Sequence, residues 1–218
     1  MIYCINLIEK GCGFMFFDAY DYIDVPRQTD NLEADVKALF LKNQKEKTFT
    51  HVMNVSKTNL RIAEQFDLHA EICQISALLH DISAVMTPAD MLAYAETHGF
   101  TLCEAECKYP FLLHQRLSAK IAEDYFAITD KRVLSAISCH TTLKDMPSKY
   151  DMALFLADKL SWDQDGTPPF YAEVSEALQV SLEKACHVYM TYINRSGTLL
   201  FPHTNWELAF EWLNHRNI

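Results

Sequence analysis

The chain has 218 residues, enough for one folded domain with elaborations, and 50% of them are apolar, which excludes a disordered or fibrous protein. Lysine and arginine number 19 against 29 aspartates and glutamates, and the net charge of −10 argues against the broad basic face that binding to nucleic-acid phosphates requires. Seven cysteines without a C-x-x-C pair favour a reducing cytoplasm, and the charges within residues 1–23 argue against a signal peptide or a membrane span there.

Helical periodicity dominates the chain after an aromatic and irregular segment, residues 1–30, which we interpret as an N-terminal extension packed on the body. From Asn31, a candidate N-cap, apolar residues recur every three or four positions. The same period predicts eight further helices, at residues 51–66, 70–81, 88–98, 114–126, 130–140, 150–160, 169–193 and 205–214. Residues 99–113 are polar enough for a surface loop, and no strand pair is convincing. An all-α domain over residues 31–218 is the prediction.

The adjacent pair His80-Asp81 ends an apolar helical run, Ile75 to Leu79. An imidazole and a carboxylate are costly to bury beside such a run unless they are paired or bind a metal. By itself the pair also fits a helix cap next to a surface acid.

Four more potential ligands lie at helix ends or on apolar helices, namely His51, His114, His140 and Asp158. Imidazole and carboxylate without thiolate suit zinc, iron or manganese, in an octahedral or facial site rather than a zinc finger. If one acid bridged two ions, the shared water would be acidified to hydroxide and could attack phosphorus without a protein nucleophile. The residues alone therefore predict a metal site and suggest phosphoester hydrolysis.

The order of these motifs resembles the HD-domain metal-dependent phosphohydrolases, and within them the bacterial YqeK-type branch, which is similar to symmetrical bis(5′-nucleosyl)-tetraphosphatases. The likeness covers roughly residues 45–165. It is carried by Thr50-His51-Val52, Ala77-Leu78-Leu79-His80-Asp81-Ile82, Leu112-Leu113-His114, Ala136-Ile137-Ser138-Cys139-His140-Thr141-Thr142 and Leu156-Ala157-Asp158-Lys159. The resemblance implies a single HD-type helical bundle with extra C-terminal helices.

The resemblance also implies two divalent metal ions, usually iron in this branch, with manganese or another transition metal as the alternative. One ion would be held by His51, His80, Asp81 and Asp158, and the other by His114, His140 and a bridging Asp81. His80, Asp81 and Lys159 would be catalytic. The implied reaction is hydrolysis of diadenosine tetraphosphate to two ADP, so the expected partner is a small nucleotide, with no nucleic acid and no membrane.

Three departures from the family pattern affect the substrate side. Ala84 stands where the family often has the lysine of His-Asp-x-x-Lys, no arginine follows Asp158 in the next seven residues, and Leu143 to Met146 replace an expected small residue. Lys159, Arg116 and Lys144 are the candidate phosphate-binding cations. His114 and His140 would face phosphate directly in a single-metal arrangement. Trp162 and Tyr109 are candidates for base stacking, with the core as their alternative role.

Two other functions stay open at this stage. The missing lysine and arginine favour a nucleoside monophosphate phosphatase or a cyclic-nucleotide phosphodiesterase on the same helices. A metal- or nucleotide-binding signalling module without catalysis is the other alternative. The stripe along residues 169–193 serves either the core or a homodimer face.

Overall fold

The computed structural model describes residues 16–162 and 166–216. These residues form eleven α-helices, two 3₁₀ helices and no β-strand, which confirms the all-α prediction. In chain order the elements are α1 (Leu32–Lys42), α2 (Glu46–Gln65), α3 (Ala70–Leu79), η1 (Ile82–Val85), α4 (Pro88–Thr97), α5 (Glu104–Lys108), η2 (Pro110–Leu113), α6 (His114–Asp124), α7 (Lys131–Ser138), α8 (Lys149–Leu160), α9 (Tyr171–Leu178), α10 (Leu182–Ser196) and α11 (Thr204–Asn214).

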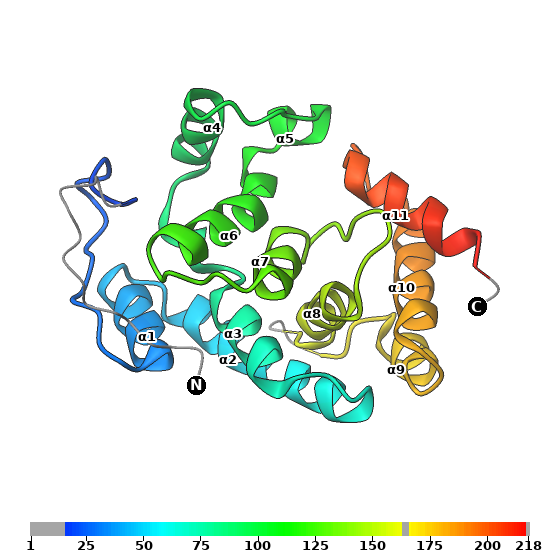
Figure 1. Cartoon of the computed structure of the whole chain (residues 1–218). Helices are drawn as coiled ribbons and strands as arrows, with labels where there is room; N and C mark the ends of the chain where they lie inside the picture. The colour runs from blue at the N-terminus through cyan, green and yellow to red at the C-terminus, as the bar shows by residue number, and fades with distance from the viewer. Residues whose placement is uncertain (1–15, 163–165, 217–218) are drawn as a thin grey trace.

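Helix α8 lies in the middle of the domain and packs against α2, α3, α7 and α10 (Figure 1). Residues 152–157 are each at most 1% exposed, so the helix is buried around its whole circumference. Its N-terminus is closed by a capping box, in which Ser148 and Asp151 each accept a hydrogen bond from the other's backbone N–H. This buried helix places Asp158 inside the domain, near its C-terminal end.

The other helices surround this centre. Helices α2 and α3 pack against each other, α6 packs on α7, and α9 and α10 form a pair that continues into α11 on the far right of Figure 1. Helix α1 lies at the opposite side of the view, and α4 and α5 lie at its top. Among the described helices, none combines the length and apolar character needed to cross a membrane.

Three predicted boundaries are corrected by the structure. Residues 169–193 do not form one helix: α9 ends at Leu178 and α10 begins at Leu182, because Ser181 is extended and its side chain accepts a hydrogen bond from the backbone N–H of Lys184. Residues 99–113 are not wholly a loop, since they contain α5 and η2. His51 does not open its helix, which begins at Glu46.

The described part of the N-terminal extension, residues 16–30, packs against the C-terminal end of α6, at Tyr125. The ring of Phe17 is buried and meets Tyr125 edge-on, with the ring centroids 5.2 Å apart. The Gln28 side chain donates a hydrogen bond of 2.8 Å to the carbonyl oxygen of Tyr125. Residues 1–15 lie outside the described part of the chain.

A buried acid, Glu106, connects α5 to the start of α11. Arg116 donates to both of its oxygens at 3.0 and 3.2 Å, the backbone N–H of Cys103 donates at 3.0 Å, and Nε2 of His203 lies 3.5 Å away. His203 also caps α11, because its Nδ1 accepts the backbone N–H of Asn205. A neutral ring that accepts at Nδ1 carries its proton on Nε2, so His203 offers Glu106 a donor rather than offering a metal a lone pair.

Glu106→Gln should destabilise the protein at neutral pH by about 3 kcal/mol, with the loss shrinking in acid. Burial raises the pKa of Glu106, but the groups from His203, Cys103 and Arg116 outweigh it and bring the pKa to about 2, against an ordinary 4.5. A depressed pKa stabilises the fold fully above about pH 4.5, and this contribution is lost as the pH falls towards 2. Denaturant unfolding of both proteins between pH 7 and pH 3 measures the difference.

The exposed Glu104, two residues earlier on α5, provides the matched control. Glu104→Gln should leave the free energy of unfolding within about 0.5 kcal/mol of the wild type at every pH. An unfolding difference for Glu106→Gln that stays constant down to pH 3 would contradict the assignment.

Candidate metal centre

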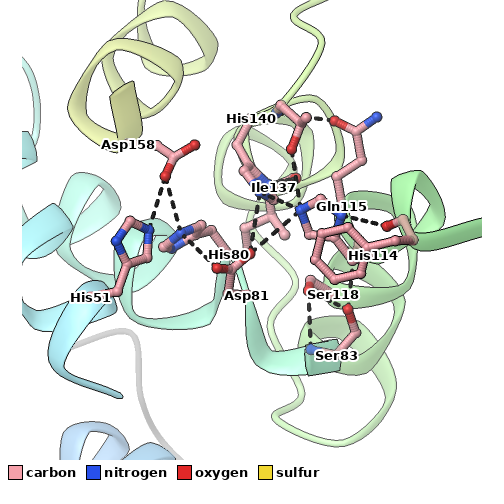
Figure 2. Close-up of polar contacts among 12 residues, drawn as sticks. His51, His80, Asp81, Ser83, His114, Gln115, Ser118, Ile137, His140 and Asp158 are labelled. Atoms are coloured by element: carbon pink, nitrogen blue, oxygen red, sulfur yellow. Dashed lines mark hydrogen bonds and ion pairs between the residues drawn. The ribbon is translucent and has the colours of Figure 1, made fainter. Parts of the chain in front are cut away.

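Six side chains from separate segments converge at the end of α8. Figure 2 shows them as a row, with His51 and Asp158 at one end, His80 and Asp81 in the middle, and His114 and His140 at the other end. The structure therefore brings together all six predicted metal ligands. They come from α2 (His51), the turn after α3 (His80, Asp81), the start of α6 (His114), the turn after α7 (His140) and α8 (Asp158).

Three of the four imidazoles are oriented by the same backbone contact. Nδ1 of His80, His114 and His140 lies 2.7, 2.7 and 2.8 Å from the carbonyl oxygen three residues earlier, on Ala77, Phe111 and Ile137. A carbonyl oxygen only accepts, so each Nδ1 carries a hydrogen and each neutral ring presents the lone pair of Nε2 to the centre. This is the tautomer that metal-binding histidines adopt when a carbonyl orients them.

The two oxygens of Asp81 face different histidines. Oδ1 lies 3.5 Å from Nε2 of His114 and 3.4 Å from Nε2 of His140, whereas Oδ2 lies 3.5 Å from Nε2 of His80. One carboxylate therefore separates the row into two halves. This placement supports a bridging role, in which each oxygen serves one ion.

The other end of the row is built around Asp158. Its Oδ1 lies 3.0 Å from Nε2 of His51 and 3.8 Å from Nε2 of His80, and its Oδ2 accepts a 2.6 Å hydrogen bond from Lys159. The Lys159 ammonium also lies over the ring of Phe155, 5.4 Å from the centroid. Lys159 is therefore adjacent to the centre, but its charge is already engaged by a ligand carboxylate.

Two features of the centre favour a bound cation. His80 is 0% exposed, and its Nε2 has no hydrogen-bond partner, a loss that ordinarily costs about 1–3 kcal/mol. The Nε2 atoms of His114 and His140 lie 3.0 Å apart, although Nδ1 carries the hydrogen on each ring. Facing lone pairs repel unless a cation lies between or beside them. A divalent metal would relieve both features, so the residues present fit a metal centre.

The protonation states also suit metal binding. Burial lowers the pKa of His80, and it lowers the pKa of His114 to about 4, so both rings are neutral near pH 7. Burial raises the pKa of Asp158, but the Lys159 ammonium beside it outweighs burial and holds the pKa well below the ordinary range. Neutral imidazoles and ionised carboxylates are the forms that coordinate metals.

Sequence reasoning missed Gln115, which sets the spacing of His114 and His140. The side chain is fully buried, and its Oε1 accepts the backbone N–H of Thr141 at 3.1 Å, while its Nε2 donates to Thr142 at 3.2 Å. The hydroxyl of Thr141 lies 3.1 Å from Nε2 of His114. A polar residue directly after a ligand, on the apolar start of a helix, is the signal that could have identified it.

A buried serine pair joins the His80-Asp81 turn to α6. Ser83 donates its hydroxyl to the carbonyl oxygen of His114 at 2.9 Å, and its backbone N–H donates to Ser118 at 3.1 Å. Both serines are 0% exposed. These bonds fix the distance between Asp81 and His114, and no spacing in the sequence indicated them.

The structure does not bring Arg116 and Lys144 to the centre. Arg116 pairs with Glu106, and Lys144 pairs at 3.2 Å with the buried carboxylate of Asp151. Both line a groove along α6 and α7 that none of the six ligands lines. Each lies close to a ligand in sequence, but each is drawn to a buried acid elsewhere, so their predicted role in phosphate binding gains no support from the geometry.

Comparison with known proteins finds related sequences and a similar fold. The model of the HD domain family matches residues 48–163. A protein of Lactococcus lactis subsp. cremoris, described as "Uncharacterized protein in pepC 5′region", is 40% identical over 123 residues, which are 56% of this chain and 63% of that protein. The Staphylococcus aureus protein named "Bis(5′-nucleosyl)-tetraphosphatase, symmetrical" is 28% identical over 123 residues, 56% of this chain and 62% of its own.

The matched segment thus spans less than two thirds of the length of these relatives. Among solved structures, a predicted HD superfamily hydrolase involved in NAD metabolism from Clostridium acetobutylicum has a TM-score of 0.74 and 23% sequence identity. The alignment covers 83% of this chain and 96% of the other, and it shows that the two chains share a fold.

Proposed function

Because this chain belongs to the HD domain family, we propose that it is a metal-dependent phosphohydrolase that acts on a nucleotide, with dinucleoside polyphosphates as the leading substrate class. The observation that carries the proposal is the convergence of three Nε2 lone pairs on the two oxygens of Asp81. The Staphylococcus aureus relative, named as a symmetrical tetraphosphatase, supports diadenosine tetraphosphate as the first substrate to test.

The six ligands would hold two divalent ions. His51, His80 and Asp158 lie on one side of Asp81, and His114 and His140 lie on the other. Such ions would supply a more acidic water and polarised phosphate oxygens. The absence of thiolate and the mixture of imidazole with carboxylate favour iron or manganese over a structural zinc.

The chain's own contribution is orientation and charge. The main-chain carbonyls hold three rings in the ligating tautomer, so little ordering remains to be done when the ions bind. Asp81 and Asp158 bring two negative charges against the four of two dications, and this excess positive charge would attract a polyphosphate. Lys159 balances Asp158 and lines the pocket beside the centre, which supports it as the cation that would meet a phosphate oxygen.

Diadenosine tetraphosphate and one water should give two ADP as the products. Cleavage of the central phosphoanhydride places the water oxygen on one ADP, and the other ADP leaves with its bridging oxygen. The test is elemental analysis of protein purified without chelator, followed by hydrolysis with product identification. About two ions per chain with ADP as sole product is the expected result.

A second candidate is a nucleoside monophosphatase or cyclic-nucleotide phosphodiesterase. The observation in its favour is the scarcity of cations, since Lys159 is the single lysine or arginine among the described residues that line the pocket beside the centre. Release of inorganic phosphate from a nucleoside monophosphate, or opening of a cyclic one, in preference to ADP formation would favour this candidate. A protein that binds nucleotide without turnover under any metal would support a signalling module instead.

A further inference from the structure

A pocket of about 380 Å³ adjoins the His51–Asp158 end of the metal centre. It lies between the C-terminal end of α8, the residues just before α9 and the helix α10, and its wall includes His51 and Asp158 themselves. Its volume lies within the range of small-molecule sites, roughly 300–1,000 Å³. A ligand that reaches one end of the row can therefore continue into this pocket.

Aromatic rings form much of the remaining lining of the pocket. Trp162 and Phe170 are nearly perpendicular, at 85° with centroids 6.2 Å apart, and Phe170 meets Tyr192 at 5.6 Å. Phe170 is buried, whereas Trp162 remains 38% exposed, so part of its ring is free to be covered by a ligand. Perpendicular rings form a corner in which a flat heterocycle can stack on one ring and contact the edge of another.

The charged side chains that line the pocket indicate whether it suits a nucleoside or a phosphate chain. Its acid and its lysine, Asp158 and Lys159, are paired at 2.6 Å, and both lie at the end next to the metal centre. Away from that end, the described lining residues carry aromatic rings, aliphatic groups and the hydroxyls of Ser196 and Thr198. Such walls match a group with apolar faces and hydrogen-bonding edges, and away from Lys159 they offer no positive charge to a chain of negative charges.

We propose that this pocket holds one nucleoside of the substrate, with Trp162 as the stacking residue, and directs its phosphates to the His51–Asp158 end of the centre. The inference rests on the proposed function and adds to it a recognition site for the base. It predicts that affinity depends on a nucleobase and that a bare phosphate chain binds less well, because no lysine or arginine other than Lys159 lines the described walls.

The test compares ADP with pyrophosphate, two ligands that share a diphosphate and differ in the nucleoside. Isothermal titration on metal-loaded protein should show that Trp162→Ala weakens ADP binding about tenfold, the loss of one base stack, and leaves pyrophosphate binding unchanged. Trp162→Phe should recover part of the lost affinity. Metal content, measured on each variant, should equal that of the wild type.

Trp212→Ala is the matched control, because it makes the same truncation on α11, where the ring contacts Arg216 and does not line the pocket. It should bind both ligands as the wild type does. An unchanged ADP affinity in Trp162→Ala, or an equal loss for ADP and pyrophosphate, would overturn the pocket assignment. Adenosine binding to chelator-treated protein separates the two proposals, since the pocket needs no metal: saturable binding that Trp162→Ala removes would uphold the pocket even if the protein proved not to hydrolyse nucleotides.

Discussion

Asp81→Ala should remove both metal ions and reduce hydrolysis by more than about a thousandfold, beyond the 10- to 100-fold typical of outer-shell residues. The reason is geometric: one oxygen of Asp81 faces His114 and His140, and the other faces His80. Loss of the carboxylate also leaves the imidazoles without the negative charge that offsets two dications. Elemental analysis and steady-state kinetics on the same preparation measure both losses.

A second substitution distinguishes the loss of metal binding from a failure to fold. Asp81→Asn keeps the volume of the side chain but not its charge, so it should fold as the wild type does and still lose both ions. Asp21→Ala, an exposed acid far from the centre in sequence, should retain metal and activity. Full metal occupancy in either Asp81 variant would refute the bridging role.

His114→Ala should lower the metal content from about two ions per chain to about one. His114 contacts the centre through Oδ1 of Asp81 and through Nε2 of His140, both on its own side of the bridging carboxylate. His51, His80 and Asp158 on the other side keep every contact that they make. Activity should fall steeply, because the reaction as proposed uses both ions.

Thermal unfolding provides an independent measure of the retained ion. Metal added at 100 times its dissociation constant stabilises a folded protein by about 2.7 kcal/mol per site, so the variant should still unfold at a higher temperature with metal than without. The exposed His98, replaced by alanine, is the control and should keep both ions. Loss of both ions from His114→Ala would show that the two halves of the row do not bind independently.

Much of the fold could be predicted from periodicity and caps. Asn31, Thr87 and Asp130 each accept a backbone N–H at the start of a helix, as their short polar side chains suggest. The break between α9 and α10 escaped prediction because the apolar stripe continues across it, from Val174 through to Leu182. The cap of α11 escaped prediction, because an imidazole, at His203, accepts the backbone N–H of Asn205, and histidine is not among the residues that usually cap helices.

The six metal ligands could be predicted from the sequence, but the positions of the charged residues around them could not. Acids and imidazoles on successive apolar helices identify six residues that the structure brings together. The positions of Arg116 and Lys144 depend instead on two buried acids, Glu106 and Asp151, whose burial is a property of the folded chain. Proximity in sequence to His114 or His140 says nothing about which carboxylate a long cationic side chain reaches.

Main-chain carbonyl groups orient three of the four histidines in the metal centre. Ala77, Phe111 and Ile137 make these contacts through their backbone oxygens, so the contacts themselves do not depend on which side chains these residues carry. The neighbouring pocket is lined mainly by residues that are not among the six ligands, such as Phe170 and Tyr192. A chain organised in this way can change its choice of substrate through substitutions at positions such as Phe170 and Tyr192 while its metal chemistry stays the same, which makes that wall the natural place to engineer a new specificity.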